Sequence, residues 1–127
     1  MNFNAATVLA DDPAARLAAA EAAAAKALSM APDHAYAHLV MGLVFGLTKC
    51  AEQGIAECER ALALDRNFAG ARGIMGFQKI LLGRAEETEA DVQEALRLSP
   101  RDPWVFAWTW FAGAAKSFLD QPEEALV

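Results

Sequence analysis

The sequence predicts an all-α protein of stacked antiparallel helix pairs, and three observations carry that prediction. A similar phrase occurs three times at an interval of 34 residues, as KALSMAPD at 26–33, RALALDRN at 60–67 and EALRLSPR at 94–101. Apolar residues make up 55% of the chain, with alanine the largest part, while Ser, Thr and Asn are few, which is a helical composition. No pattern of alternating apolar and polar residues predicts a strand.

Positions 34 residues apart agree along the chain. Ala27, Ala61 and Ala95 share one such position, and the dipeptides at 41–42 and 75–76 are both Met-Gly. Several agreements at one interval indicate an internal repeat, in which each unit buries its apolar side against its neighbours.

Each unit divides into two helical segments of different character. The segments at 35–48 and 69–82 are apolar on nearly every side, which predicts helices covered from more than one direction. The segments at 51–64 and 85–98 are polar on one side only, which predicts surface helices. We expect helices at about 13–30, 34–48, 51–64, 69–82, 85–98 and 103–119, and the start of another from 122.

Residues at the expected helix ends support these boundaries. Asp12 and Pro13 suit an N-cap and a first-turn proline. Asp33 is the expected N-cap of the next helix. Gly83 follows an apolar helix and suits a left-handed C-terminal cap.

The period, the helix pairs and the small residues where the helices cross resemble the tetratricopeptide repeat (TPR). The small positions of that family correspond here to Gly42 and Gly76, to Gly54 and Thr88, and to Ala61 and Ala95. The resemblance spans about residues 12–127 and implies an α-α superhelix. It divides a single domain, 1–127, into a partial first repeat at 1–34, full repeats at 35–68 and 69–102, and a truncated fourth at 103–127.

The last repeat departs from the family pattern. Trp110 and Pro122 stand where small residues are expected, and moving the alignment by three residues places Ala125 at the second of these positions. We therefore expect the first helix of this repeat to be about a turn longer. The chain ends at Val127, within the helix expected to cover the preceding one.

A narrower resemblance concerns residues 51–67 and 94–102. They are similar to repeat regions of bacterial proteins in which such an array follows a class III adenylate or guanylate cyclase domain, or the DNA-binding domain of a transcription regulator. This resemblance implies a regulatory segment that acts on a domain outside this sequence.

The TPR resemblance also implies that the first helices of the repeats line a concave groove. The side chains expected there are uncharged, which disfavours the family's clamp for a peptide carboxylate and favours an apolar or amphipathic helix of a protein partner. The alternative is a superhelix so tight that these side chains pack on one another; Arg72 and Lys79 are expected at the rim or in packing positions. The expected partner-binding residues are Tyr36, Leu39, Leu43, Leu47, Phe77, Ile80, Leu81, Trp104 and Phe111.

The aromatic run PWVFAWTWFAGAAKSF at 103–118 has more large side chains than one helix face can hold. Those that no capping helix covers predict self-association as a homodimer or larger homo-oligomer. The alternative is an end that is frayed but soluble. The residues expected to self-associate are Phe106, Trp108, Trp110 and Phe118.

Charge and composition exclude several classes of partner. The net charge is −6 and the 11 Lys and Arg are scattered, so we expect no nucleic-acid binding. No apolar run approaches the roughly 20 residues that span a bilayer, and no secretory signal begins the chain, so we expect no membrane association. Cys50 and Cys58 have neither zinc-finger nor disulfide spacing, which suits a reducing cytoplasm.

Candidate chemistry is sparse, and we expect a non-enzymatic scaffold without metal or cofactor. His34 and His38 have the i, i+4 spacing of a metal pair but lack a third ligand in the sequence. Cys58 occupies a packing position. Acidic residues at 86–91 suit a helix N-terminus and need no catalytic role.

Overall fold

The computed structural model describes residues 12–48 and 50–120. Over these residues the chain forms six α-helices and one 3₁₀ turn, with no strand, so the all-α prediction is confirmed. The elements are α2 (Pro13–Met30), α3 (Ala35–Leu47), α4 (Ala51–Leu64), α5 (Ala69–Leu81), η1 (Ala85–Glu87), α6 (Thr88–Leu98) and α7 (Val105–Asp120).

The expected helix bounds agree with the structure except at one element. The helix expected at 85–98 begins instead as the 3₁₀ turn η1 and becomes α-helical at Thr88. A local ion pair accompanies the tighter turn: the Arg84 guanidinium donates to both carboxylate oxygens of Glu87, at 2.8 and 2.9 Å. This pairing holds the pKa of Glu87 at about 2. The helix expected from 122 lies outside the described residues.

Two of the three expected caps are confirmed. The Asp12 carboxylate accepts from the backbone N–H groups of Ala14 and Ala15, at 3.0 and 3.3 Å. Gly83 has φ 75°, a left-handed conformation that glycine adopts without steric cost. The expectation for Asp33 is wrong, because the imidazole of His34 caps α3 by accepting from Ala37 N–H at 3.2 Å.

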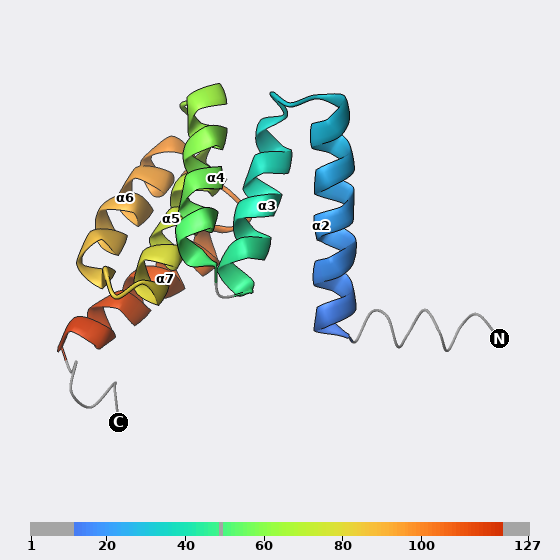
Figure 1. Cartoon of the computed structure of the whole chain (residues 1–127). Coiled ribbons are helices and arrows are strands. Elements are labelled where there is room, and N and C mark those ends of the chain that lie inside the picture. The colour runs from blue at the N-terminus through green and yellow to red at the C-terminus, as the bar shows by residue number, and fades with distance from the viewer. Residues whose placement is uncertain (1–11, 49, 121–127) are drawn as a thin grey trace.

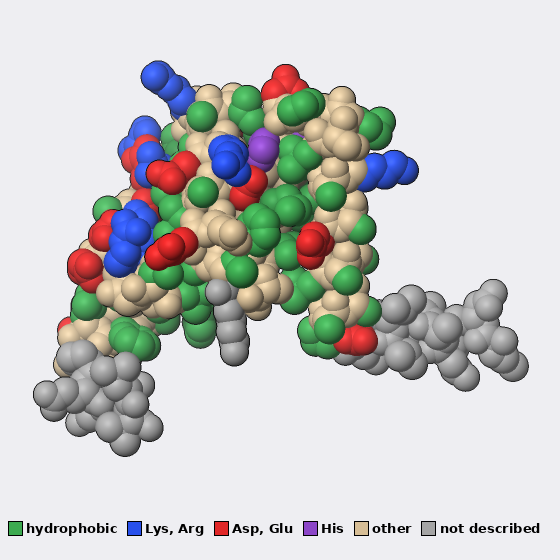
Figure 2. Space-filling model, in the orientation of Figure 1, with side chains coloured by type: hydrophobic (Ala, Val, Ile, Leu, Met, Phe, Trp, Pro, Cys, Tyr) green, Lys and Arg blue, Asp and Glu red, His purple; other side chains and the backbone are tan. Residues whose placement is uncertain are grey.

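Successive helices from α2 to α6 run antiparallel and pack side by side (Figure 1). α3 and α5 contact each other, as do α5 and α7, so these three form an inner row. α4 packs on α3 and α5, and α6 packs on α5 and α7, which places both on the other side of that row. Figure 2 shows charged side chains gathered over the side of the molecule that carries α4 and α6.

The inner and outer helices cross at small residues that recur after 34 positions. A Cβ added to Gly42 on α3 would lie 3.0 Å from the carbonyl oxygen of Gly54 on α4. The equivalent crossing joins Gly76 on α5 to Thr88 on α6, where an added Cβ would lie 3.4 Å from the Thr88 carbonyl oxygen. The two backbones therefore approach closely at equivalent positions of both pairs.

A polar contact that was not predicted from the sequence also recurs at the same interval. His38 Nδ1 on α3 lies 3.1 Å from Glu57 Oε2 on α4. The residues 34 positions later make the matching contact, with Arg72 on α5 donating to Asp91 Oδ1 on α6 at 3.4 Å. The carboxylate of each surface helix thus faces a nitrogen side chain of its inner helix.

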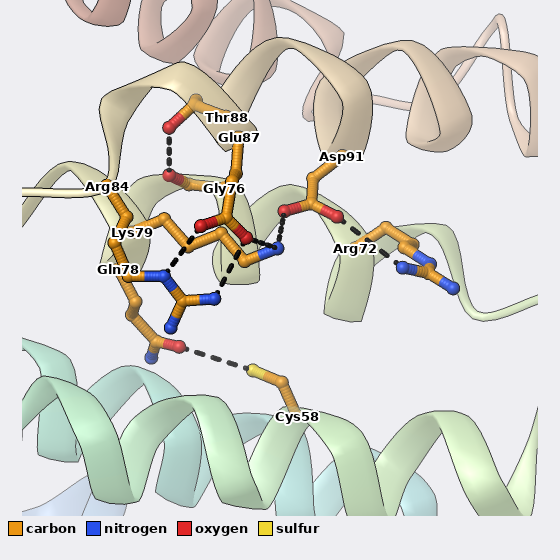
Figure 3. A network of polar contacts seen from close by, with 9 residues as sticks. All are labelled: Cys58, Arg72, Gly76, Gln78, Lys79, Arg84, Glu87, Thr88 and Asp91. Atoms are coloured by element: carbon orange, nitrogen blue, oxygen red, sulfur yellow. Dashed lines mark hydrogen bonds and ion pairs between the residues drawn. The ribbon is translucent and has the colours of Figure 1, made fainter. Parts of the chain in front are cut away.

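The helix pair α5–α6, which we call the second pair, carries additional buried polar groups (Figure 3); the first pair is α3–α4. Lys79, a packing residue as one alternative expected, is buried with its Nζ 2.7 Å from Asp91 Oδ2. The Gln78 side chain is fully buried and donates to the Gly42 carbonyl oxygen at 2.6 Å, which ties α5 to α3. Thr88 Oγ1 donates to the Gly76 carbonyl oxygen at 2.9 Å. These bonds satisfy polar groups that would be costly to bury alone.

Two apolar clusters form the core. The first joins α4 to α5 and includes Cys58 and Met75, and the second joins α5 and α6 to α7 around Trp108. Cys58 is fully buried, as its packing position predicts. The helix α5 therefore covers the pair α3–α4, and the helix α7 covers the pair α5–α6.

Candidate functional site

A groove of about 590 Å³ lies along the inner row of helices, and Leu98 at the C-terminal end of α6 is also part of its lining. α3, α5 and α7 supply its walls, and the loops that precede α5 and α7 close one end. Most of its lining is apolar. The central lining residues are Tyr36, Leu39, Val40 and Leu43 on α3, Gly70 and Ile74 on α5, and Ala107, Trp108 and Phe111 on α7, with Trp104 just before α7.

The hollow exists because equivalent positions of the inner row differ in size. Tyr36, Gly70 and Trp104 are 34 residues apart, so a residue without a side chain stands between two aromatic residues. Tyr36 is 62% exposed and Trp104 is 60% exposed, and both line the groove. A Cβ on Gly70 would already lie 3.3 Å from Leu39, so a larger side chain there would project into the groove.

The structure brings five of the nine expected partner-binding residues together in this groove. They are Tyr36, Leu39, Leu43, Trp104 and Phe111. The other four lie farther along α3 and α5 and do not line it; they are Leu47, Phe77, Ile80 and Leu81. Phe77 packs on Phe111 with ring centroids 4.9 Å apart, so it contacts a residue of the groove wall without lining the groove itself.

Trp108 was expected on the self-association surface, and the structure places it in the core instead. Its side chain is 1% exposed, and its indole lies over Gly73 so closely that a Cβ there would overlap the ring. Because α7 turns Trp108 and Ala115 toward α5 and α6, the residues on its opposite side face outward.

The outward side of α7 carries two of the remaining aromatic residues expected to self-associate, Phe106 and Trp110, whereas Phe118 stands seven residues after Phe111, on the same stripe of the helix. Phe106 is 71% exposed, Trp110 is 66% exposed, and Phe118 is also exposed. Phe106, Trp110, Gly113 and Ser117 follow a 4-3-4 spacing, which is that of the apolar seam between two paired helices. No atom outside the local helix lies within 4 Å of the position where a Gly113 Cβ would stand, so two large residues are followed by two small ones on an open face.

One end of the groove is polar, a feature that was not predicted from the sequence. Asp65 and Asn67 from the loop before α5 line this end, with Ser99 and Asp102 from the loop before α7. Asp65 Oδ1 accepts from Asn67 N–H at 3.1 Å, and the Asp102 carboxylate accepts from Trp104 N–H at 2.9 Å and Ser99 Oγ at 3.1 Å. The sequence pattern that could have indicated this polar end is an acidic residue after each surface helix, Asp65 after α4 and Asp102 after α6.

The reactive side chains are held in structural contacts. His34 Nδ1 caps α3, while the ring nitrogens of His38 contact Glu57 and the Pro32 carbonyl oxygen. Burial raises the pKa of Cys58 to about 12, with help from the nearby Glu57 and Glu59 carboxylates, so Cys58 is a protonated thiol at neutral pH. Among residues 12–48 and 50–120, no three His, Cys, Asp or Glu side chains cluster as metal ligands would.

No protein-family model matches this chain, and a search of the curated proteins finds no match for it. Within the described part of the chain, no helix combines the length and apolar character needed to cross a bilayer. Fold and site therefore define an all-α protein with an apolar groove on one side of its helix row.

Proposed function

We propose that this protein is a non-enzymatic binding module that holds an apolar or amphipathic helix of a protein partner in the groove between α3, α5 and α7. The observation that carries the proposal is the groove itself, about 590 Å³ of mostly apolar surface that the described residues leave open to solvent. Open apolar surface is costly in water and usually marks an interaction site. An amphipathic helix would cover it with residues spaced at i, i+3, i+4 and i+7.

The 34-residue correspondences support the interpretation of the chain as a TPR-like array. The contacts Gly42–Gly54 and Gly76–Thr88 are equivalent, and so are His38–Glu57 and Arg72–Asp91. In this proposal the helices continue as a superhelix, with the inner row on its concave side.

Self-association through the outward side of α7 is a second part of the proposal. Phe106 and Trp110 supply two large exposed aromatic residues one helical turn apart, and burying each contributes roughly 1.5–3 kcal/mol. We exclude Trp108 from this surface because it is already buried. Two antiparallel copies of α7 would place the aromatic residues of each over Gly113 and Ser117 of the other.

The groove proposal is tested with Leu43→Glu, which places a charge on the apolar wall. Leu64→Glu is the matched control, because Leu64 is an exposed leucine on α4 outside the groove. Calorimetry with a synthetic amphipathic helix should show binding to the wild type and the control and at least tenfold weaker binding to Leu43→Glu. Gly70→Leu should also block binding, because it fills the hollow without introducing charge. Equal binding to all four proteins would contradict the proposal.

Sedimentation velocity tests the α7 surface. The wild type should dimerise at tens of micromolar, and Trp110→Glu should be monomeric with unchanged helicity. A wild-type monomer at these concentrations, or a dimer that Trp110→Glu leaves intact, would exclude this surface.

An alternative function is a regulatory TPR segment that acts on a nucleotide cyclase or a DNA-binding domain of the same protein. The observation that favours it is the similarity of residues 51–67 and 94–102 to the repeat regions of such proteins. The length of the natural open reading frame distinguishes this alternative from a free-standing module.

A further inference from the structure

Resting on the proposed function, we propose that the partner helix is basic: it carries a Lys or Arg next to its apolar stripe, and this cation binds between Asp65 and Asp102. The polar end of the groove specifies the charge of the partner, while the apolar wall specifies only its hydrophobic face. The two features together predict one orientation of the bound helix, with its cationic end beside the loops that precede α5 and α7.

The charged residues in the groove lining are both negative. Asp65 and Asp102 are the charged residues among the described groove lining, and no described Lys or Arg forms an ion pair with either. Arg66 and Arg101 are their neighbours in the sequence but do not line the groove. The basic side chains of α5, Arg72 and Lys79, form ion pairs with Asp91, and Lys116 on α7 does not line the groove.

Aromatic side chains line the groove together with the two carboxylates. Tyr36 and Phe68 stack with ring centroids 6.3 Å apart, and both line the groove with Trp104. A cation over an aromatic face is attracted by the ring quadrupole, which adds to its attraction to a carboxylate. A Lys or Arg side chain also has an apolar stem, which can cover these rings while its charged end reaches the carboxylates.

The carboxylates retain capacity to bind a cation. Asp65 uses Oδ1 for Asn67 N–H, and its second oxygen accepts no hydrogen bond from the described residues. The Asp102 carboxylate accepts hydrogen bonds from Ser99 Oγ and Trp104 N–H. These bonds orient the carboxylate without neutralising its charge. An ionised carboxylate has about four acceptor sites, so further donors can be accommodated at both.

Charge also decides between a foreign helix and a second copy of this chain. The chain carries a net charge of −6, which opposes seating a second copy at the acidic end of the groove, whereas a basic helix is attracted there over a distance set by the ionic strength. The outward surface of α7 that we assign to self-association borders the groove, because the ring of Trp110 is in edge contact with the groove-lining Phe111, with centroids 6.0 Å apart. The acidic end of the groove itself suits a partner of opposite charge.

The test uses two synthetic amphipathic helices that share one apolar stripe and differ at a single end position, Lys in one and Glu in the other. Calorimetry at low and at physiological salt measures their affinity for the wild type, for Asp65→Asn, for Asp102→Asn and for the control Asp33→Asn. Asp33→Asn removes the same charge from an exposed loop residue that does not line the groove. Circular dichroism checks that each variant keeps its helicity, and Asp65→Asn suffices if Asp102→Asn disturbs the start of α7.

We expect the Lys peptide to bind about tenfold tighter than the Glu peptide to the wild type and to Asp33→Asn. Each groove variant should reduce that preference about threefold to fivefold, and added salt should reduce it further. Equal affinities of the two peptides for the wild type overturn the basic-partner inference and leave the proposed function intact. Failure of both peptides to bind overturns the proposed function itself. Dimerisation that Leu43→Glu abolishes would identify a second copy as the occupant and overturn the inference.

Discussion

The helix pairs α3–α4 and α5–α6 are built on the same plan with different chemistry. Both cross at a glycine of the inner helix, Gly42 or Gly76, but the partner residue is Gly54 in the first pair and Thr88 in the second. Both place a carboxylate of the outer helix against a nitrogen of the inner helix, yet only the second adds the buried Lys79. Backbone spacing is the shared requirement, and side-chain chemistry varies within it.

The largest expected effect concerns the residue that covers each pair. Ile74 covers the first pair and Trp108, 34 positions later, covers the second. Trp108→Ala should reduce the free energy of unfolding by about 3–5 kcal/mol, because it leaves a large cavity between α5, α6 and α7. Ile74→Ala should cost less, since Ile74 is only partly buried. Urea denaturation measures both, and an effect of Trp108→Ala below that of Ile74→Ala would contradict the assigned cores.

The next largest loss of stability is expected from breaking the buried Lys79–Asp91 ion pair of the helix pair α5–α6. Asp91→Ala should destabilise the protein by about 3 kcal/mol, because the buried Lys79 then loses its nearer carboxylate, at 2.7 Å, and keeps only the more exposed Glu87 carboxylate at 3.6 Å. The double variant Lys79→Met with Asp91→Leu should recover most of that loss, since it removes both charges. Glu57→Ala in the first pair should cost less, because its partners are His38 and the exposed Arg60. If the double variant is as unstable as Asp91→Ala alone, the attraction between Lys79 and Asp91 contributes more to stability than the burial of their two charges costs.

Alanine substitutions at the glycines where the helices cross should change the free energy of unfolding less, and differently in the two pairs. Gly54→Ala places a Cβ 2.8 Å from the Gly42 carbonyl oxygen, so it should cost about 1–3 kcal/mol by overpacking. Gly76→Ala meets its nearest atoms at 3.4 Å, an ordinary contact, and alanine favours the helix by about 1 kcal/mol. We therefore expect Gly76→Ala to be neutral or stabilising in thermal unfolding. Equal losses from the two substitutions would mean that the crossings are not spaced as described.

The smallest effect is a pH dependence confined to the first pair. Cys58 corresponds to Val92 in the second pair, and burial raises the pKa of the Cys58 thiol from 9.0 to about 12. Because the folded pKa lies above the unfolded one, this contribution to stability is complete below about pH 9 and is lost as the pH rises toward 12. Cys58→Val should remove that part of the alkaline loss of stability. In the folded wild type at pH 8, iodoacetamide should modify Cys50 and spare Cys58.

Much of the architecture was predictable because it depends on backbone geometry that short sequence signals report. The 34-residue recurrence of Gly42 and Gly76 marks where helices approach, and Asp12 and Gly83 mark helix ends by capping chemistry. Asp33 failed as a cap because His34, one residue later, has an imidazole nitrogen able to do the same work.

The site was less predictable because it depends on how each helix is turned about its axis. An aromatic run surrounds α7 on all sides, so the sequence does not reveal that Trp108 faces inward and Trp110 outward. The polar end of the groove combines Asp65 and Asp102, which lie in separate loops, so only the folded chain shows that they line one space. The bond from Gln78 to the Gly42 carbonyl oxygen spans two helices and has no local signature.

The most direct measurement of the central claim is NMR chemical-shift mapping of the ¹⁵N-labelled protein during titration with the Lys-bearing amphipathic helix. The groove account predicts that the largest shifts occur at the amides of Leu39, Leu43, Gly70 and Ala107, with little change on the exposed sides of α4 and α6. Shifts concentrated on α4 and α6, or no saturable shifts at all, would contradict the claim that this groove binds a helix.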